Sequence, residues 1–349
     1  MVCVRHGAGQ PSKSKGNIMK ALKIATLAGM LLASASPAFA QDLYPVTFQL
    51  KWVNQGQFAG YLVAKDMGYY EDAGLDVTIN PGGPDIAPEQ VIAGGGADVI
   101  TTWMAAGLAA RERGVPLVNI AQPFATTALE MVCSEESGVE STADFPGKTL
   151  GVWFFGNEYP FYAWMAQLGL STDGGDDGVE VLRQAFSADP LLQNQADCIS
   201  VMRYNEYKQV LDAGIPEDSL TLFNFADEGV GMLEDGLYVM EDRLEDPEFV
   251  EAMAAFVEAS MAGWEYAAAN PEEAAEIVIN NDMSGALTLE SQVYQVNEAA
   301  ALVGDTPALD VEAYDQTVAT LLSAVSPDNP AITEEPEGAY TTVVTDAIE

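Results

Sequence analysis

Strand-like and helix-like segments alternate along the chain from residue 44 to about residue 241. This alternation is typical of parallel βαβ units, in which a helix crosses back over the sheet between two strands. After Leu244 the pattern changes to helices, first over residues 246–268 and then from Asn270-Pro271, where proline marks a new helix start. The sequence therefore predicts an α/β fold with a helical C-terminal region. The strands are expected near residues 46–52, 75–80, 97–101, 116–121, 128–133, 149–154, 179–184, 198–203, 221–225 and 236–240.

Two breaks in this alternation predict two lobes, each a mostly parallel sheet flanked by helices. Gly147-Lys148-Thr149 opens a second βα series, and Glu241 begins the helical run. We therefore expect the chain to cross between lobes near residues 126–133 and again near 231–240. The predicted parts are an N-terminal extension with a signal peptide (1–40), lobe I in two pieces (41–127 and the helical 232–325), lobe II (128–231) and a C-terminal tail (326–349).

Residues 19–40 have the three regions of a secretory signal peptide: a basic start, a short apolar stretch and small residues before Gln41. We expect cleavage after Ala40 and export to the periplasm, with Met1 and Met19 both open as the start. The residue directly after Ala40 is Gln41 and not a cysteine, which argues against a lipid anchor. No later segment has about 20 uninterrupted apolar residues, so the mature protein is not expected to be embedded in a membrane.

The predicted mature protein is strongly acidic. Cleavage after Ala40 removes five of the 14 basic side chains and none of the 53 acidic ones, which leaves nine against 53 and a net charge near −44. A field of this sign repels nucleic acid and anionic lipid. We therefore exclude nucleic acids and membrane surfaces as partners.

Two cysteines, Cys133 and Cys198, remain after the predicted cleavage, and both lie in strand-like segments. Disulfides persist in the periplasm. A bridge between the two would require neighbouring strands, whereas two buried thiols would behave as small apolar side chains. Both possibilities stay open at this point.

Three stretches of the chain carry a resemblance to a known family. Residues 57–77, the pair Ala97-Asp98 and residues 145–152 resemble the periplasmic substrate-binding proteins of the sulfonate, nitrate and thiamine-pyrimidine-precursor group. The similarity is greatest to the branch shared with thiamine pyrimidine synthase and extends over nearly the whole mature chain. It implies a two-lobed periplasmic-binding-protein-like fold of type II, which closes about a hinge and delivers a small solute to an ABC permease with its ATPase.

In that architecture five loops at predicted strand ends converge, and ligands of open α/β sheets bind at such ends. The loops are rich in aromatic and amide side chains, which suit a flat, neutral or weakly basic heterocycle better than a sulfonate or nitrate. The candidate ligand contacts are Trp52, Asn54, Gln57, Trp103, Phe124, Phe155, Asn157, Glu158, Tyr159, Arg203, Tyr204, Asn205 and Glu206.

Several of these residues have an equally plain structural interpretation. Trp52 ends an apolar strand face and is as well suited to core packing as to ligand stacking. Glu158 and Glu206 could be solvated charges, and Arg203 could form a cross-lobe ion pair with a carboxylate. Trp153, two residues after Gly151 in a strand, is interpreted as a core residue.

An enzyme is the main alternative, because the resembling family includes a thiamine pyrimidine synthase. That enzyme uses a histidine and a cysteine-rich iron-binding segment. The single histidine, His6, precedes the predicted cleavage point, so the mature chain has no imidazole for acid–base chemistry and no cysteine cluster for a metal. We therefore predict a monomeric binding protein that is not an enzyme and has no cofactor or metal.

The predicted ligand is a small heterocyclic solute, first of all a thiamine pyrimidine precursor such as hydroxymethylpyrimidine or formylaminopyrimidine. Riboflavin or another heterocyclic vitamin is the next candidate. A sulfonate or nitrate is the third.

Overall fold

A computed structural model describes residues 43–154, 156–324 and 330–348, which belong to one compact unit, 41–349. The predicted signal peptide and its cleavage point after Ala40 lie outside the described residues. Two five-stranded sheets organise this unit. All ten predicted strands are present in the structure, most within a few residues of the expected bounds.

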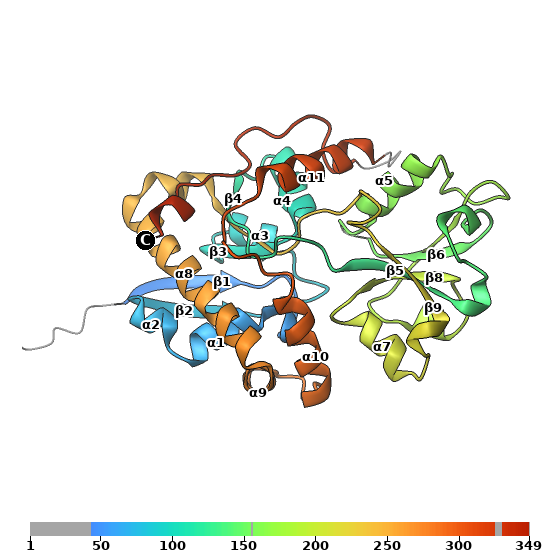
Figure 1. Cartoon of the computed structure of the whole chain (residues 1–349). Helices are drawn as coiled ribbons and strands as arrows, with labels where there is room; N and C mark the ends of the chain where they lie inside the picture. The colour runs from blue at the N-terminus through green and yellow to red at the C-terminus, as the bar shows by residue number, and fades with distance from the viewer. Residues whose placement is uncertain (1–42, 155, 325–329, 349) are drawn as a thin grey trace, which may run out of the picture. The chain divides into compact units, whose positions relative to one another are not determined.

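The first sheet has the strand order β2-β1-β3-β10-β4. Figure 1 labels its strands β1, β2, β3 and β4. β1 pairs in parallel with β2 and β3, whereas β10 pairs antiparallel with β3 and β4. Four strands therefore run in one direction and β10 runs against them. The bounds are β1 Tyr44–Gln49, β2 Leu75–Asn80, β3 Val99–Thr102, β4 Leu117–Ala121 and β10 Gly236–Met240.

The second sheet repeats this arrangement with the order β7-β6-β8-β5-β9. β6 is parallel to β7 and β8, whereas β5 is antiparallel to β8 and β9. The prediction of mostly parallel strands is confirmed in both sheets, with one reversed strand in each. The bounds are β5 Leu129–Ser134, β6 Thr149–Val152, β7 Glu180–Arg183, β8 Cys198–Met202 and β9 Leu220–Asn224.

Each reversed strand is the one that enters its sheet from the other sheet. Leu129, the first residue of β5, lies opposite Met202, the last residue of β8. Gly236, the first residue of β10, lies opposite Thr102, the last residue of β3. The two connections between the sheets therefore join both sheets on the side where the parallel strands have their carboxyl ends. The predicted lobe boundaries fall within these connections and stay a prediction.

Helices cover both faces of the first sheet. Side chains along one strand alternate between the faces, so neighbouring residues show which core covers each face. In β10, Leu237 and Val239 join the core under α1 and α8, whereas Tyr238 joins the core on the side of α4. The helices that pack on or beside this sheet are α1 Ala59–Asp66, α2 Tyr69–Asp72, α3 Pro88–Ala93, α4 Met104–Glu112, α8 Pro247–Ala269, α9 Pro271–Asn280, α10 Leu289–Ala300 and α11 Val311–Ser323. The second sheet carries α5 Glu158–Leu168, α6 Asp189–Leu192 and α7 Glu206–Asp212.

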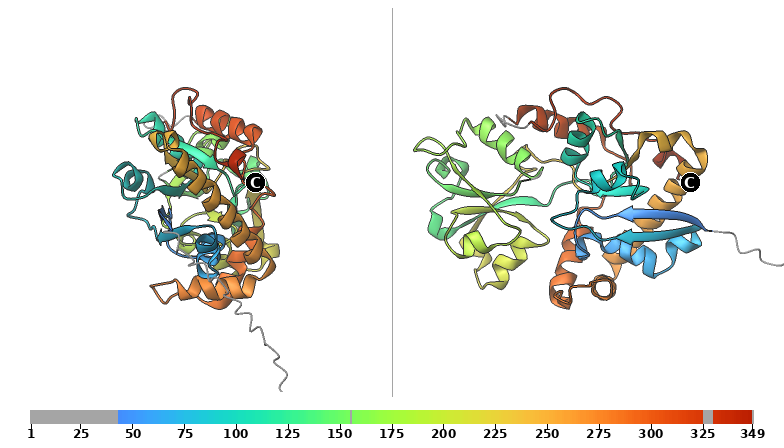
Figure 2. Two further views of the ribbon diagram at one scale, coloured as in Figure 1. Left: turned by 90° about the vertical axis from the view of Figure 1, so that its left-hand side faces the viewer. Right: turned by 180° about the vertical axis from the view of Figure 1, so that it is seen from behind.

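Glycine permits the close packing of α1 against α8, the long orange helix in Figures 1 and 2. A Cβ atom on Gly263 would lie 2.0 Å from the carbonyl oxygen of Gly60, and one on Gly60 would lie 2.3 Å from the indole of Trp264. The two helices can therefore approach only with glycine at both positions. This contact fixes the start of α1, and with it the loop after β1 that carries part of the candidate site.

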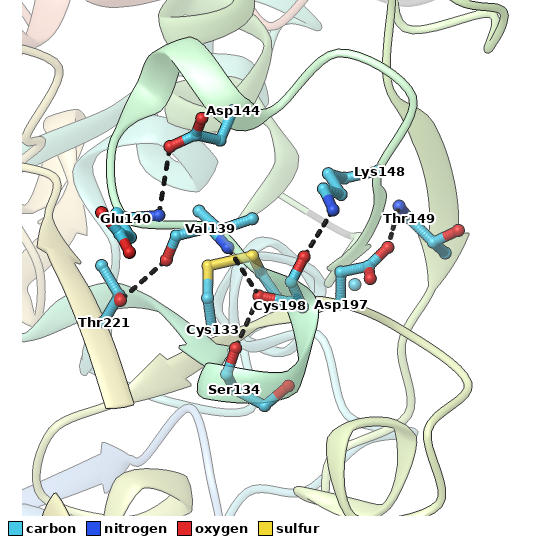
Figure 3. The surroundings of a disulfide bond; sticks show 12 residues. Cys133, Ser134, Val139, Glu140, Asp144, Lys148, Thr149, Asp197, Cys198 and Thr221 are labelled. Carbon is cyan, nitrogen blue, oxygen red and sulfur yellow. Dashed lines mark hydrogen bonds between the residues drawn. A yellow bond between two sulfur atoms is a disulfide. The ribbon is translucent and has the colours of Figure 1, made fainter. Parts of the chain in front are cut away.

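Cys133 and Cys198 form a disulfide across the paired strands β5 and β8 (Figure 3). Both cysteines are fully buried. The pair Cys133 and Cys198 lies at one end of these two strands, and the pair Leu129 and Met202 lies at the other end. The bridge therefore ties the second sheet together on the side away from the connections.

Candidate functional site

A cleft of about 480 Å³ lies where strands of both sheets end. Trp52 follows β1, Trp103 follows β3, Trp153 follows β6 and Met202 ends β8. This is the edge at which ligands of open α/β sheets bind. The predicted contacts that line the cleft are Trp52, Gln57, Trp103, Asn157, Tyr204, Asn205 and Glu206.

Three predicted residues from the loops after β1, β4 and β8 do not line the cleft, because other parts of the chain hold them. Asn54 donates a hydrogen bond to the carbonyl oxygen of Asn281, 2.9 Å away. Phe124 is buried edge-on against Trp264 of α8. Arg203 forms an ion pair of 2.9 Å with Glu130 of β5, so the alternative of an ion pair is confirmed, but the pair lies within the second lobe and not across the lobes.

The segment after β6 also differs from the prediction. The Glu158 carboxylate turns back and accepts a hydrogen bond of 2.7 Å from the backbone N–H of Gly156. Burial raises the pKa of Glu158. Tyr159 is packed in the core of the second lobe and does not reach the cleft. Phe155 lies outside the described residues.

The cleft contains residues that the sequence interpretation missed. Trp153, interpreted as core, is largely buried but lines the cleft, with its indole N–H donating to the carbonyl oxygen of Ala185 at 3.0 Å. Phe186 follows β7, a strand end that the prediction left out. Its position after a predicted strand was the signal that could have identified it. Further lining residues are Lys51, Gln55, residues 83–90, Thr102, Ala106, Phe154, Gly156 and Met202.

Aromatic rings from both lobes meet across the cleft. The ring of Phe186 lies 4.8 Å from that of Trp52 and 6.5 Å from that of Trp153, centroid to centroid. Phe186 is 43% exposed although it is a large apolar side chain. Trp52 is half-buried. Such accessible faces suit a flat aromatic ligand, which would stack on them.

Amide side chains and one ion pair form the polar part of the site on the lobe I side. Gln55 donates to Gln57 at 2.8 Å, and Gln57 donates to Asp235 at 2.6 Å. The other carboxylate oxygen of Asp235 lies 2.9 Å from the Lys51 ammonium. That ammonium also sits 4.1 Å from the ring centre of Trp103, within the range of a cation–π contact.

The lobe II side contributes a buried carboxylate. Glu206 begins α7 and accepts hydrogen bonds from the backbone N–H of Met202 and the side chain of Asn205. Burial raises the pKa of Glu206 to about 7, since its desolvation outweighs these bonds. Near neutral pH this group exists in both protonation states, so it can either donate to or accept from a ligand.

Side chains of α10 link the two lobes beside the cleft. Gln295 donates to the side-chain oxygen of Asn205 at 3.2 Å, and the Tyr294 hydroxyl donates to the carbonyl oxygen of Arg203 at 3.2 Å. Lys208 of α7 lies 3.6 Å from Glu290 of α10. These contacts hold the loop after β8 close to lobe I.

A second buried carboxylate, Glu234, joins the two connections between the sheets. It precedes β10 and accepts hydrogen bonds from the backbone N–H of Ala128, at 2.9 Å, and from the hydroxyl of Thr127, both just before β5. Burial is the main cause that raises the pKa of Glu234 to about 7; Lys51 lowers it and Asp235 adds to the rise. The ordinary value is 4.5.

This raised pKa predicts a pH-dependent contribution to stability. Because the folded pKa lies above the ordinary one, Glu234 destabilises the fold increasingly as the pH rises from about 4.5 through about 7. Glu234→Gln keeps an oxygen that accepts both bonds but cannot ionise. We therefore compare the free energy of unfolding of Glu234→Gln with that of the natural protein. This difference should shift in favour of the variant by on the order of 2 kcal/mol between about pH 5 and about pH 8.

Urea unfolding at both pH values measures this difference. Glu258→Gln, at an exposed position of α8, is the control and should leave the pH dependence unchanged. A constant difference between Glu234→Gln and the natural protein across this pH range would contradict the prediction.

The described residues contain no group of three or more histidine, cysteine, aspartate or glutamate side chains placed to hold a metal ion. Among them there is also no helix long and apolar enough to cross a membrane.

Solved structures share this architecture. The periplasmic aliphatic sulphonate binding protein SsuA from Escherichia coli superimposes with a TM-score of 0.63 at 15% identity, covering 84% of this chain and 96% of its own. Two mixed sheets flanked by helices, with a cleft where their strands end, define the fold of periplasmic binding proteins. The fold expected from the sequence is thereby confirmed.

Sequence comparison places the chain within a family. The chain belongs to the NMT1/THI5-like family, which matches residues 55–274. It is 24% identical to the formylaminopyrimidine-binding protein of Halalkalibacterium halodurans in an alignment of 331 positions that covers 91% of this chain and 98% of that protein. It is 27% identical to the riboflavin-binding protein RibY of Chloroflexus aurantiacus over 75% of this chain and 74% of that protein.

Proposed function

We propose that this protein is the periplasmic solute-binding subunit of an ABC importer and that it binds a thiamine pyrimidine precursor of the formylaminopyrimidine or hydroxymethylpyrimidine type. The observation that carries the proposal is the cleft between the lobes, where Trp52 and Phe186 present aromatic faces beside Gln55, Gln57 and other polar groups. A flat heterocycle fits such a site, because rings stack on aromatic faces while amides fix the ring edge.

The relative named as a formylaminopyrimidine-binding protein supports this choice, since the similarity covers nearly the full length of both chains. We further propose export by the predicted signal peptide, action as a monomer, and delivery of the bound solute to a permease with its ATPase.

Riboflavin is the second candidate. The series of rings from Trp52 through Phe186 to Trp153 is longer than a single pyrimidine needs, and would also suit the larger flavin ring system. The relative RibY supports this alternative. A sulfonate is less compatible with the cleft, because its cation Lys51 is already paired with Asp235.

An enzymatic role is less compatible with the residue set. The chain has one histidine, His6, ahead of the predicted cleavage point. The synthase of the resembling family uses a histidine and a cysteine-rich iron-binding segment, and the described residues that line the cleft include neither histidine nor cysteine. We therefore propose binding without turnover.

Thermal unfolding with candidate ligands tests the proposal. A ligand at 100 times its Kd stabilises the folded state by about 2.7 kcal/mol, so a saturating pyrimidine precursor should raise the Tm by several degrees. Taurine and nitrate, at equal concentration, should leave the Tm unchanged. A large rise with taurine and none with formylaminopyrimidine, hydroxymethylpyrimidine or riboflavin would refute the assignment. Mass spectrometry of any small molecule that co-purifies provides an independent check.

A further inference from the structure

Lys51 is the only basic side chain among the described residues that line the cleft. Its ammonium lies 2.9 Å from Oδ1 of Asp235, and the two side chains are 18% and 2% exposed. Asp235 is itself held in place, because Gln57 donates to its other oxygen. The ion pair is therefore nearly buried, and both carboxylate oxygens of Asp235 have a partner.

Other acidic groups surround this cation. The buried carboxylates Glu206 and Glu234 both interact electrostatically with Lys51. Asp85 and Glu89 line the cleft as well. An anion that entered the cleft would meet a cation that is already paired with Asp235, and acidic side chains in the cleft lining. Electrostatic complementarity of this kind sets specificity more than it sets affinity.

We propose that Asp235 determines the charge selectivity of the cleft. By pairing with Lys51 it withdraws the one cation, among the described residues that line the cleft, able to hold a sulfonate or another anionic group, so the site accepts neutral and cationic aromatic ligands and rejects anionic ones. Asp235 does not line the cleft; it is a positioning residue that acts through Lys51. This inference rests on the proposal that the cleft is the ligand site.

The backbone at this position allows a clean test. Asp235 has φ of +29°, in the region that asparagine and aspartate tolerate better than other side chains with a Cβ. Asp235→Asn therefore removes the charge while it keeps the shape and the conformation. Lys51 would then remain over Trp103 with its charge uncompensated by Asp235. Asp235→Gly, which also tolerates a positive φ, is the second variant if the first does not fold.

The experiment measures the binding of three probes that share one ring and differ in charge: benzenesulfonate, benzamide and benzamidinium. In the natural protein, benzamidinium and benzamide should bind at least tenfold more tightly than benzenesulfonate. In Asp235→Asn, the ratio of benzenesulfonate to benzamidinium affinity should rise at least tenfold. Adding Lys51→Met to this variant should abolish the gain, because methionine keeps the length of the side chain but not its charge.

Two results would overturn the inference. One is a natural protein that binds benzenesulfonate as tightly as benzamidinium. The other is a folded Asp235 variant, confirmed by its thermal unfolding, whose probe preference is unchanged. Failure of the proposed function would be seen separately, as no binding of formylaminopyrimidine, hydroxymethylpyrimidine or riboflavin by the natural protein.

Discussion

Replacing Cys133 and Cys198 together with alanine should lower the free energy of unfolding by about 4 kcal/mol. The two cysteines are 65 residues apart, and the disulfide restricts a loop of that length in the unfolded chain. The loop contains β6, β7 and α5, which is most of the second lobe. Its release should therefore allow this lobe to unfold more readily. Guanidinium unfolding of the natural and variant proteins under oxidising conditions gives the value.

A reducing agent provides the control for this prediction. Reductant should bring the natural protein close to the variant and leave the variant itself unaffected. If the variant were still about 4 kcal/mol less stable than the reduced natural protein, packing of the buried sulfur atoms and not the covalent bond would carry the effect. Ligand binding should change less than threefold at temperatures where the variant is folded, because the bridge lies at the end of β5 and β8 away from the cleft.

The fold was largely predictable because its signals are local. Alternating side chains such as Val46 and Phe48 identify a strand without knowledge of its partners. Asn270-Pro271 likewise places the start of α9 correctly. The first strand ends at Gln49 instead of Trp52, because the chain then turns so that the carbonyl oxygen of Trp52 accepts from the backbone N–H of Gly82. That partner lies 30 residues away and leaves no mark in the local pattern.

The candidate site was predictable only in part, because distant contacts decide which side chains face the cleft. Phe124 packs on Trp264, and Arg203 pairs with Glu130. Neither partner can be recognised from the loop that carries the residue. In contrast, Trp103 directly follows β3 and Trp52 lies three residues after β1, so their placement depends mainly on where those strands end.

The ion pair of Lys51 shows the same limit in terms of charge. A lone lysine beside aromatic and amide residues in the sequence is compatible with an anion site. Asp235, which cancels this charge, is 184 positions further along the chain and enters the site only because β10 returns to the first sheet beside β3. The charge of the cleft is therefore a property of the topology and not of any one loop.

Trp52→Ala should weaken ligand binding about thirtyfold, which corresponds to about 2 kcal/mol. The Trp52 ring is half-buried and lies 4.8 Å from Phe186, so its removal opens one wall of the cleft. Stability should fall by less than the binding energy, because part of this ring remains accessible in the folded protein. Calorimetric titration with formylaminopyrimidine or riboflavin, whichever the natural protein binds, measures the affinity.

Two further variants separate stacking from general damage to the fold. Trp52→Phe keeps an aromatic face at the same position and should recover most of the affinity. Tyr69→Ala removes a half-buried ring of α2 outside the cleft and should leave binding unchanged while it costs comparable stability. If Trp52→Ala bound ligand as tightly as the natural protein but unfolded at a much lower temperature, Trp52 would be a core residue and the ligand would have to contact other rings of the cleft. Weakened binding at a nearly unchanged Tm, restored by phenylalanine, would instead assign the indole face to ligand contact, since only a ring at this position distinguishes the two variants.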